Sequence, residues 1–161
     1  MASKHQMTGM RGVYLVAAEL SRLGFIVSPT SRSAAGADLL VTDQKCQKAW
    51  SVQVKTNKSP ANFWLVGANA AKLKSASHAY VFVNIRNEGR PEYVVAPSVH
   101  VAAKVVKETT KTGSVWYSFS RQDRLYASEG WELFGDPQGD SESDADEGSA
   151  RGNSSKEGNS G

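Results

Sequence analysis

The chain contains 161 residues, of which 22% are charged and 40% are hydrophobic, a size typical of one compact domain rather than two. A single cysteine, Cys46, excludes an internal disulfide and a cysteine-rich zinc site, and it fits a reducing compartment. The apolar runs are much shorter than the ~20 residues needed to cross a bilayer, and the first residues lack the apolar segment of a secretory signal. We therefore expect a cytoplasmic protein that makes no membrane contact.

The charge is divided unevenly along the chain. Residues 1–135 hold 17 basic and 9 acidic residues, a net charge of +8, whereas residues 136–161 hold 2 and 7, a net charge of −5. A basic body favours a polyanionic partner, although charge of this size also serves solubility alone. Residues 136–161 are mostly Ser, Gly, Asp and Glu and have too little apolar surface to fold. We predict a folded domain at 1–135 and a disordered acidic tail at 136–161.

The first third of the chain predicts a helix followed by strands. Apolar residues recur at helical spacing from Val13 to Leu23, and Gly24 is suited to end that helix. A short apolar run at 25–27 and a polar loop follow. Residues 37–41 predict a strand, residues 43–47 a turn, and the alternation over residues 50–55 predicts a second strand with two different faces.

The rest of the chain continues the mixture of helix and strand. Residues 63–66 predict a short strand, 68–75 a short helix or turn, 79–85 a buried central strand, and 93–96 a further strand. A second helix is expected from Pro97 to about Glu108, with aromatic residues beyond it supplying packing. The order of elements predicts an α/β or α+β fold with a mixed central β-sheet flanked by helices.

Four polar residues stand where the patterns favour apolar ones. Glu19 borders the apolar stripe of the first helix, Asp38 begins an apolar strand, and Gln53 and Lys55 share one face of the next strand. Each alone has an ordinary explanation as an exposed helix edge, a turn residue or a solvated strand face. Two neighbouring strands joined by a tight turn would nevertheless bring Asp38 close to Gln53 and Lys55.

This combination suits hydrolysis of a phosphodiester bond. Mg²⁺ prefers oxygen ligands, which Asp38, the amide of Gln53 and the backbone carbonyl of Val54 can supply. Lys55 would then orient or deprotonate the attacking water, or stabilise charge that develops on the phosphate. Glu19 would hold a metal-bound water or a second metal from the helix side.

The segments GADLL and WSVQVKT resemble the core of the PD-(D/E)XK nuclease superfamily, the restriction-endonuclease-like fold, over about residues 12–56. The resemblance implies that Glu19 is the helix acid, Asp38 the metal-binding aspartate, Gln53 the residue at the variable acidic position, and Lys55 the family's lysine. Two departures are that Ala37 stands where a proline is common and that Gln53 replaces an acid, which removes one negative charge from the metal site.

The resemblance implies a metal-dependent DNA endonuclease that uses Mg²⁺ or Mn²⁺. It leaves open a domain that binds DNA or a protein partner without cutting it. A third interpretation is an interaction protein whose acidic tail mimics DNA and covers the basic face. No P-loop, no G-x-S-x-G and no histidine spacing suited to zinc is present in the sequence.

Several basic residues are candidates for binding DNA, either duplex or branched. We predict that Arg32, Lys58, Lys72 and Lys74 contact the phosphate backbone, with ordinary surface positions as the alternative. A homodimer is plausible because cutting both strands of a duplex commonly uses two active sites.

Overall fold

The computed structural model describes residues 1–31 and 36–140. The predicted DNA contact at Arg32 and the predicted disorder of residues 141–161 lie outside the described residues. No helix within the described part of the chain is long and apolar enough to cross a membrane.

Helix α1 (Lys4–Arg22) begins nine residues before the predicted start at Val13. Ser3 and Gln6 form a capping box, in which the Gln6 N–H donates to Ser3 Oγ at 3.2 Å and the Ser3 N–H donates to Gln6 Oε1 at 2.8 Å. The helix ends as expected beside Gly24, whose φ of 101° is a left-handed conformation that favours glycine. The Ser-x-x-Gln spacing is the sequence signal that marks the earlier start.

A five-stranded mixed sheet confirms the predicted fold class. Its strands are β1 (Ile26–Pro29), β2 (Leu39–Thr42), β3 (Ala49–Asn57), β5 (His78–Asn84) and β6 (Glu92–Pro97), in the order β1-β2-β3-β5-β6. Only β3 and β5 run parallel; the other neighbours are antiparallel. All seven residues of β5 are buried, as its unbroken apolar run predicted.

A second, smaller sheet, which the sequence did not predict, packs on one face of the main sheet. It consists of β4 (Phe63–Val66), β8 (Val115–Ser120) and β7 (Val106–Thr109), in that order. The expected continuation of the second helix to Glu108 is wrong. Helix α2 (Ser98–Lys104) stops because Val105 is extended, and the next residues pair with β8. The short 3-10 helix η1 (Ala68–Ala71) lies beside α2.

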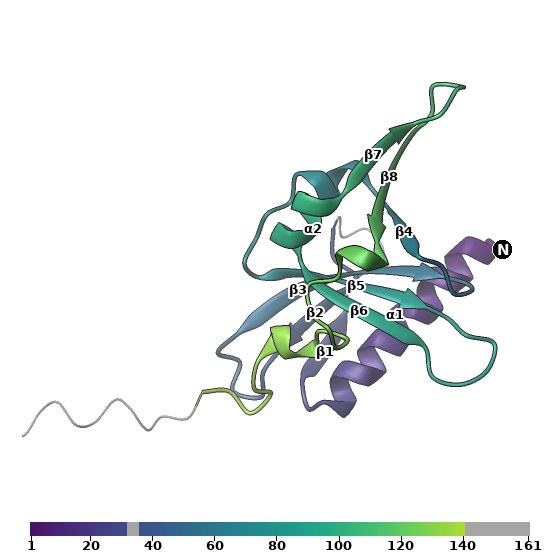
Figure 1. Ribbon diagram of the computed structural model, residues 1–161. Coiled ribbons are helices and arrows are strands. Elements are labelled where there is room, and N and C mark those ends of the chain that lie inside the picture. The colour runs from purple at the N-terminus through teal and green to yellow at the C-terminus, as the bar shows by residue number, and fades with distance from the viewer. Residues whose placement is uncertain (32–35, 141–161) are drawn as a thin grey trace, which may run out of the picture.

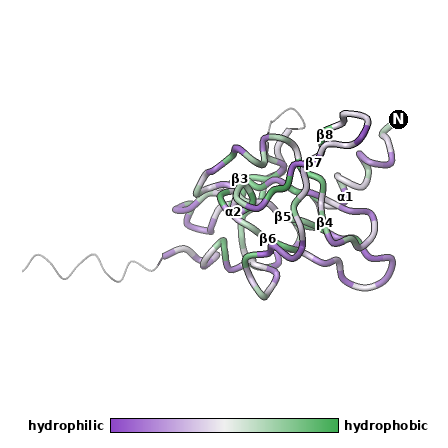
Figure 2. The backbone as a smooth tube through the Cα atoms, turned by 45° about the horizontal axis from the view of Figure 1, so that its top comes forward, coloured by the Kyte–Doolittle hydropathy of each residue, from purple (hydrophilic) through white to green (hydrophobic). Residues whose placement is uncertain are grey.

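The fold therefore has three layers, with α1 on one face of the main sheet and the small sheet and α2 on the other (Figure 1). Two separate hydrophobic clusters hold the layers together. Val16 and Leu20 of α1 pack on one face with Val52 and Val54. The cluster on the opposite face is formed by Trp64, Val66, Ala70, Tyr80, Phe82, Val94, Ala96, Val101 and Phe119. In Figure 2 the hydrophobic stretches gather in the strands at the centre.

The carboxyl-terminal part of the described chain returns to the α1 side of the sheet. After η2 (Arg121–Asp123), the short helix η3 (Trp131–Phe134) places Phe134 in the α1-side core. Contacts with the body continue past the predicted boundary at residue 135, because Pro137 O accepts from Gln44 N at 2.8 Å and Lys48 Nζ lies 3.0 Å from Asp140. The folded body thus extends about five residues beyond that boundary.

Two glycines inside α1 have different surroundings. A Cβ at Gly12 would lie 1.8 Å from Thr56 Oγ1, so this glycine allows α1 to lie directly on β3. A Cβ at Gly9 would meet nothing within 4 Å. Only Gly12 is therefore required by packing.

We expect Gly12→Ala and Gly9→Ala to change stability in opposite directions. Gly12→Ala should lower the free energy of unfolding by about 1–3 kcal/mol, because Thr56 and its strand must move to relieve the clash. Gly9→Ala should raise it by about 0.5–1 kcal/mol through helix propensity. Chemical denaturation of both variants measures the difference, and equal effects at the two positions would contradict the close contact of α1 with β3.

Candidate functional site

The pairing of β2 with β3 builds the site. Leu39 lies opposite Val52, and the Asp38 N–H extends the ladder by donating to Val52 O at 2.7 Å. The turn that joins the strands is fixed by Asp43, which is 0% exposed and accepts from Gln47 N at 3.0 Å and Lys48 N at 2.8 Å. Burial acts to raise the pKa of the Asp43 carboxyl, but these backbone N–H groups outweigh it and lower the pKa.

The structure brings Asp38 and Gln53 into direct contact. Asp38 Oδ2 accepts hydrogen bonds from Gln53 Nε2 at 2.9 Å and from Val54 N at 2.8 Å. The N–H and C=O of one strand residue point to the same side of the strand, so the Val54 carbonyl lies on the edge of β3 that faces Asp38. A carboxylate, an amide and a backbone carbonyl therefore meet where β2 begins.

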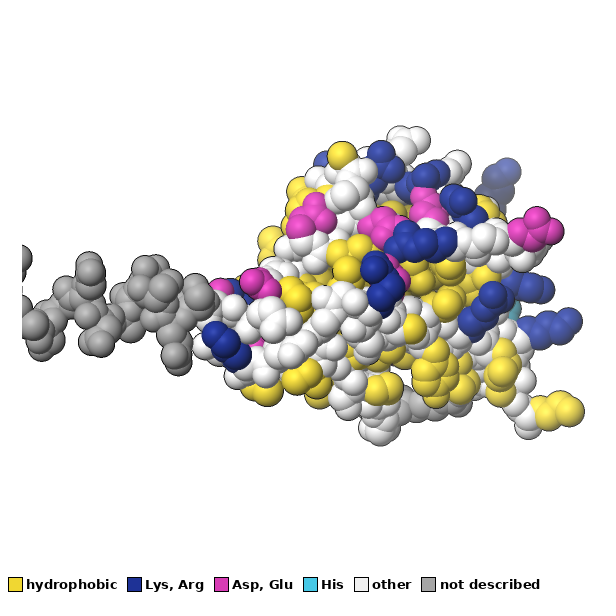
Figure 3. All heavy atoms as spheres, turned by 90° about the horizontal axis from the view of Figure 1, so that it is seen from below, with side chains coloured by type: hydrophobic (Ala, Val, Ile, Leu, Met, Phe, Trp, Pro, Cys, Tyr) yellow, Lys and Arg dark blue, Asp and Glu magenta, His cyan; other side chains and the backbone are white. Residues whose placement is uncertain are grey.

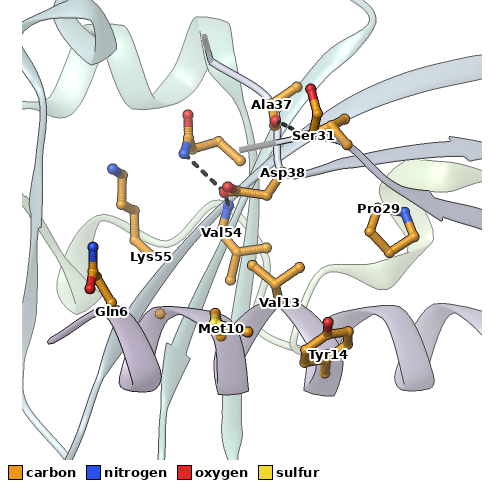
Figure 4. Close-up of a pocket in the computed structure, with 13 residues that line it drawn as sticks. Gln6, Met10, Val13, Tyr14, Pro29, Ser31, Ala37, Asp38, Val54 and Lys55 are labelled. Carbon is orange, nitrogen blue, oxygen red and sulfur yellow. Dashed lines mark hydrogen bonds between the residues drawn. The ribbon is translucent and has the colours of Figure 1, made fainter. Parts of the chain in front are cut away.

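Asp38 lines a cleft of about 440 Å³ between the amino-terminal half of α1 and β3 (Figure 4). Lys55 rises from β3 on one side of the carboxylate, and the helix supplies the opposite wall. The residues that line the cleft from α1 are Gln6, Gly9, Met10, Val13 and Tyr14. This helix wall contains the Gln6 amide, the Tyr14 phenol and apolar groups but no acid.

A second hollow of about 540 Å³ adjoins the first on the side of the small sheet. Gln53 and Lys55 line both hollows, and Lys72 and Tyr80 line the second. Gln53 is the register partner of Tyr80 in β5, which places both side chains on the face of the main sheet that is opposite α1. Within the described residues, Lys55 and Lys72 have no acidic partner.

The predicted role of Glu19 at this centre needs correction. Glu19 does not line the cleft: it lies six residues beyond Val13, about 9 Å along the helix axis and about a third of a turn around it. Its side chain is 11% exposed and pairs with Arg22 and Arg90, both at 2.7 Å. Arg90 also pairs with Glu129 from the carboxyl-terminal segment. Glu19 thus joins α1 to two distant segments instead of facing Asp38.

The hydrogen bonds of this cluster lower the pKa of the Glu19 carboxyl. The hydrogen bond from Arg22 lowers the pKa of the Glu19 carboxyl; partial burial opposes this, and Arg90 lowers it further. Arg90 also lies over the Tyr93 ring, 5.2 Å from its centroid. These contacts give Glu19 a structural role that its position on an apolar helix edge did not reveal.

The predicted DNA-contacting lysines do not lie in one place. Lys72 lines the second hollow, Lys58 lies beside α1 near Ile85, and Lys74 is exposed and lines neither hollow around Asp38. Figure 3 shows one face of the molecule, on which Lys and Arg side chains stand among acidic side chains and hydrophobic patches. The positive charge on this face is therefore not a continuous stripe, and Lys72 is the predicted contact that shares a hollow with Gln53 and Lys55.

The donors around Asp38 fit a hard cation with few protein ligands. The carboxylate of Asp38 and the carbonyl of Val54 are oxygen donors, which Mg²⁺ prefers. The Gln53 amide turns its nitrogen to Asp38 in this structure and would offer its oxygen to an ion after turning over. Among residues 1–31 and 36–140, no three His, Cys, Asp or Glu side chains form a group able to hold a metal. Mg²⁺ commonly keeps several waters and is completed by substrate phosphates, so one carboxylate is compatible with binding.

Sequence reasoning missed the residues that complete the two hollows. Tyr80 sits in the middle of an apolar strand and reads as core, while Met10, Val13 and Gln6 belong to a helix that approaches the centre only in the folded chain. No local pattern marks Tyr80, because its place follows from the parallel pairing of β3 with β5, which sets residue 80 opposite residue 53.

The chain matches no family model and none of the curated proteins. Seven chains of solved structures match it. One is Hjc of Archaeoglobus fulgidus, a Holliday junction resolvase from an archaeal hyperthermophile, with 11% identity and a TM-score of 0.45 over 72% of this chain and 86% of that chain.

The lowered pKa of Glu19 predicts how the free energy of unfolding depends on pH. Because the folded-state pKa lies below the ordinary value of 4.5, the contribution of the carboxylate is fully present above that value and is lost as pH falls through the folded-state pKa. Glu19→Gln should therefore cost about 1 kcal/mol at pH 7, and the difference from wild type should shrink below pH 4.5. Denaturation at several pH values measures this. The matched variant Glu88→Gln changes an exposed carboxylate and should give no such trend, and a constant Glu19→Gln effect would contradict the assignment.

Proposed function

We propose that this protein is a divalent-metal-dependent DNA endonuclease whose centre is Asp38, Gln53, Val54 and Lys55. The observation that carries the proposal is the Asp38 carboxylate, held by Gln53 and the Val54 N–H at the mouth of a cleft that Lys55 also lines. An anchored carboxylate beside a lysine without an acidic partner is an arrangement that suits metal-assisted hydrolysis of a phosphodiester.

Each residue of the centre has a separate task in this proposal. Asp38, the Gln53 amide oxygen and the Val54 carbonyl would hold Mg²⁺ or Mn²⁺. The bound ion would supply Lewis acidity toward the phosphate and favour deprotonation of a water. Lys55 would neutralise negative charge on the scissile phosphate and orient the water, and the Val54 N–H would keep Asp38 in place.

The small number of charges at the centre predicts that metal binding depends on DNA. One carboxylate is a weak anchor for a divalent ion, and phosphate oxygens of the substrate would complete its coordination. The net charge of +8 on residues 1–135 would draw DNA to the cleft and supply part of the affinity. Lys72 would contact a neighbouring phosphate from the second hollow. A homodimer would supply the second centre that cutting both strands of a duplex requires.

The test is cleavage of plasmid, duplex and four-way-junction DNA in Mg²⁺, in Mn²⁺ and in EDTA. Wild type should cut only with metal. We expect Asp38→Asn and Lys55→Ala each to lower the cleavage rate by at least about a hundredfold, because the first removes the charged ligand and the second the one lysine that lines the cleft in the described part of the chain.

Matched variants make the cleavage experiment specific. Asp123→Asn and Lys45→Ala change the same residue types away from both hollows and should cut like wild type. Thermal unfolding of every variant confirms that the fold is kept. Cleavage by Asp38→Asn at the wild-type rate would refute the assignment, and so would cleavage that persists in EDTA.

A second candidate function is DNA binding without hydrolysis. The observation that favours it is the absence of any acid other than Asp38 among the described residues around the cleft, where Gln53 takes the expected acidic position and Val13 faces the cleft from α1. In that case wild type would retard DNA on a gel and never cut it, with or without metal.

Gln53→Glu separates the two candidates through stability. In EDTA the variant should be about 1–3 kcal/mol less stable than wild type, because it exchanges the amide hydrogen bond with Asp38 for a repulsion between two carboxylates. In millimolar Mn²⁺ the two carboxylates should hold the ion, and Tm should recover by mass action. Gln47→Glu, in the β2–β3 turn, serves as the control. If Mn²⁺ stabilises neither wild type nor Gln53→Glu, even when duplex DNA is present, the centre does not bind metal and the second candidate is favoured.

A further inference from the structure

Tyr80 is a buried tyrosine whose ring is fixed in place. It lies in the middle of β5 with 3% of its surface exposed. The ring stacks on Phe82 with centroids 5.7 Å apart, and it makes an edge contact with His78 at 5.1 Å. These neighbours hold the ring in one orientation, so the direction of its hydroxyl is determined by packing.

The hydroxyl of Tyr80 has no hydrogen-bond partner within the described residues, although buried tyrosines usually find one. It is not among the fully enclosed polar atoms that lack a partner, which are Thr56 Oγ1, His78 Nδ1 and Arg121 Nε. Tyr80 instead lines the second hollow. A partly enclosed O–H therefore points into a cavity and can donate to a ligand there.

The chemistry around this hydroxyl selects an anionic ligand. Lys55 and Lys72 line the same hollow, and neither has an acidic partner in the described chain. Burial raises the pKa of the Tyr80 phenol, so the group remains a hydrogen-bond donor at neutral pH. One neutral donor in a hollow that two lysines also line suits a phosphate oxygen better than a cation or an apolar group.

We propose that Tyr80, Lys55 and Lys72 form a phosphate subsite, in which the Tyr80 hydroxyl donates a hydrogen bond to a non-bridging oxygen of the DNA backbone. The inference rests on the proposed function, since it assigns the second hollow to the nucleotide next to the one at Asp38. Gln53 belongs to both hollows and pairs in register with Tyr80, so one strand of DNA can pass from the cleft into the subsite.

Tyr80→Phe is the direct test because it removes only the hydroxyl. The affinity for a fluorescein-labelled duplex, measured in EDTA by anisotropy, should fall about tenfold, while Tm stays equal or rises slightly because no protein hydrogen bond is lost. Tyr93→Phe is the matched control: Tyr93 is also buried, but it packs on the α1 side of the sheet, so DNA affinity should not change.

The salt dependence separates the two kinds of contact in the subsite. Lys72→Ala should reduce the slope of log Kd against log salt by the amount expected for about one phosphate contact. Tyr80→Phe should weaken binding at every salt concentration with the slope unchanged. A purely structural tyrosine would not produce this difference.

Binding and cleavage are read separately, so the two proposals can fail separately. If wild type never cuts but Tyr80→Phe loses DNA affinity, the endonuclease assignment fails and the subsite stands. If Tyr80→Phe binds DNA as tightly as wild type, or wild type binds no DNA, the subsite is overturned whatever the cleavage result. A fall in Tm large enough to explain the lost affinity would also overturn it.

Discussion

The pairing of β2 with β3 is the constraint on which the candidate centre depends. Leu39 must lie opposite Val52 for the Asp38 carboxylate to reach Gln53 and the Val54 N–H. A slip of one residue would turn every side chain of the shifted strand to the other face of the sheet and separate these groups. Asp43 protects the register from the far end, because its buried carboxylate fixes the backbone of the turn. A structural aspartate and the aspartate of the candidate centre thus stand at opposite ends of a four-residue strand.

The alternation of β3 determines which other groups can join the centre. Val52 and Val54 face α1 and form core, so Gln53 and Lys55 must face the small sheet. Gly12 lets α1 lie directly on the opposite face, and the helix approaches Asp38 only with its amino-terminal half. Glu19, at the other end of the helix, is used to join α1 to Arg90 and, through it, to Glu129. The amino-terminal half of α1 therefore lines the candidate cleft, whereas Glu19 near the other end of the helix holds distant segments together.

The centre has little negative charge and considerable positive charge nearby. Asp38 is the one carboxylate at the cleft within the described residues, while Lys55 and Lys72 line the adjoining hollow. Electrostatics of this kind favour binding of a phosphate backbone first and of a metal second. Tyr80 adds a hydrogen-bond donor that loses little conformational entropy on binding, because its ring is already held by Phe82 and His78. DNA binding is accordingly common to both candidate functions, and hydrolysis is what distinguishes them.

The sequence by itself determined the features that depend on neighbouring residues. The apolar alternation of residues 50–55, the buried run at 79–85 and the turn between two strands predicted the mixed sheet and the meeting of Asp38 with Gln53. The tertiary structure alone decided the rest. Whether Glu19 faces the cleft depends on how α1 rotates and slides on the sheet, which Gly12 and Thr56 settle by contact. Residues 106–109 became a strand because β8 offers them an edge to pair with. Tyr80 acquired its place in the hollow from a parallel pairing across 27 residues, which no local pattern encodes.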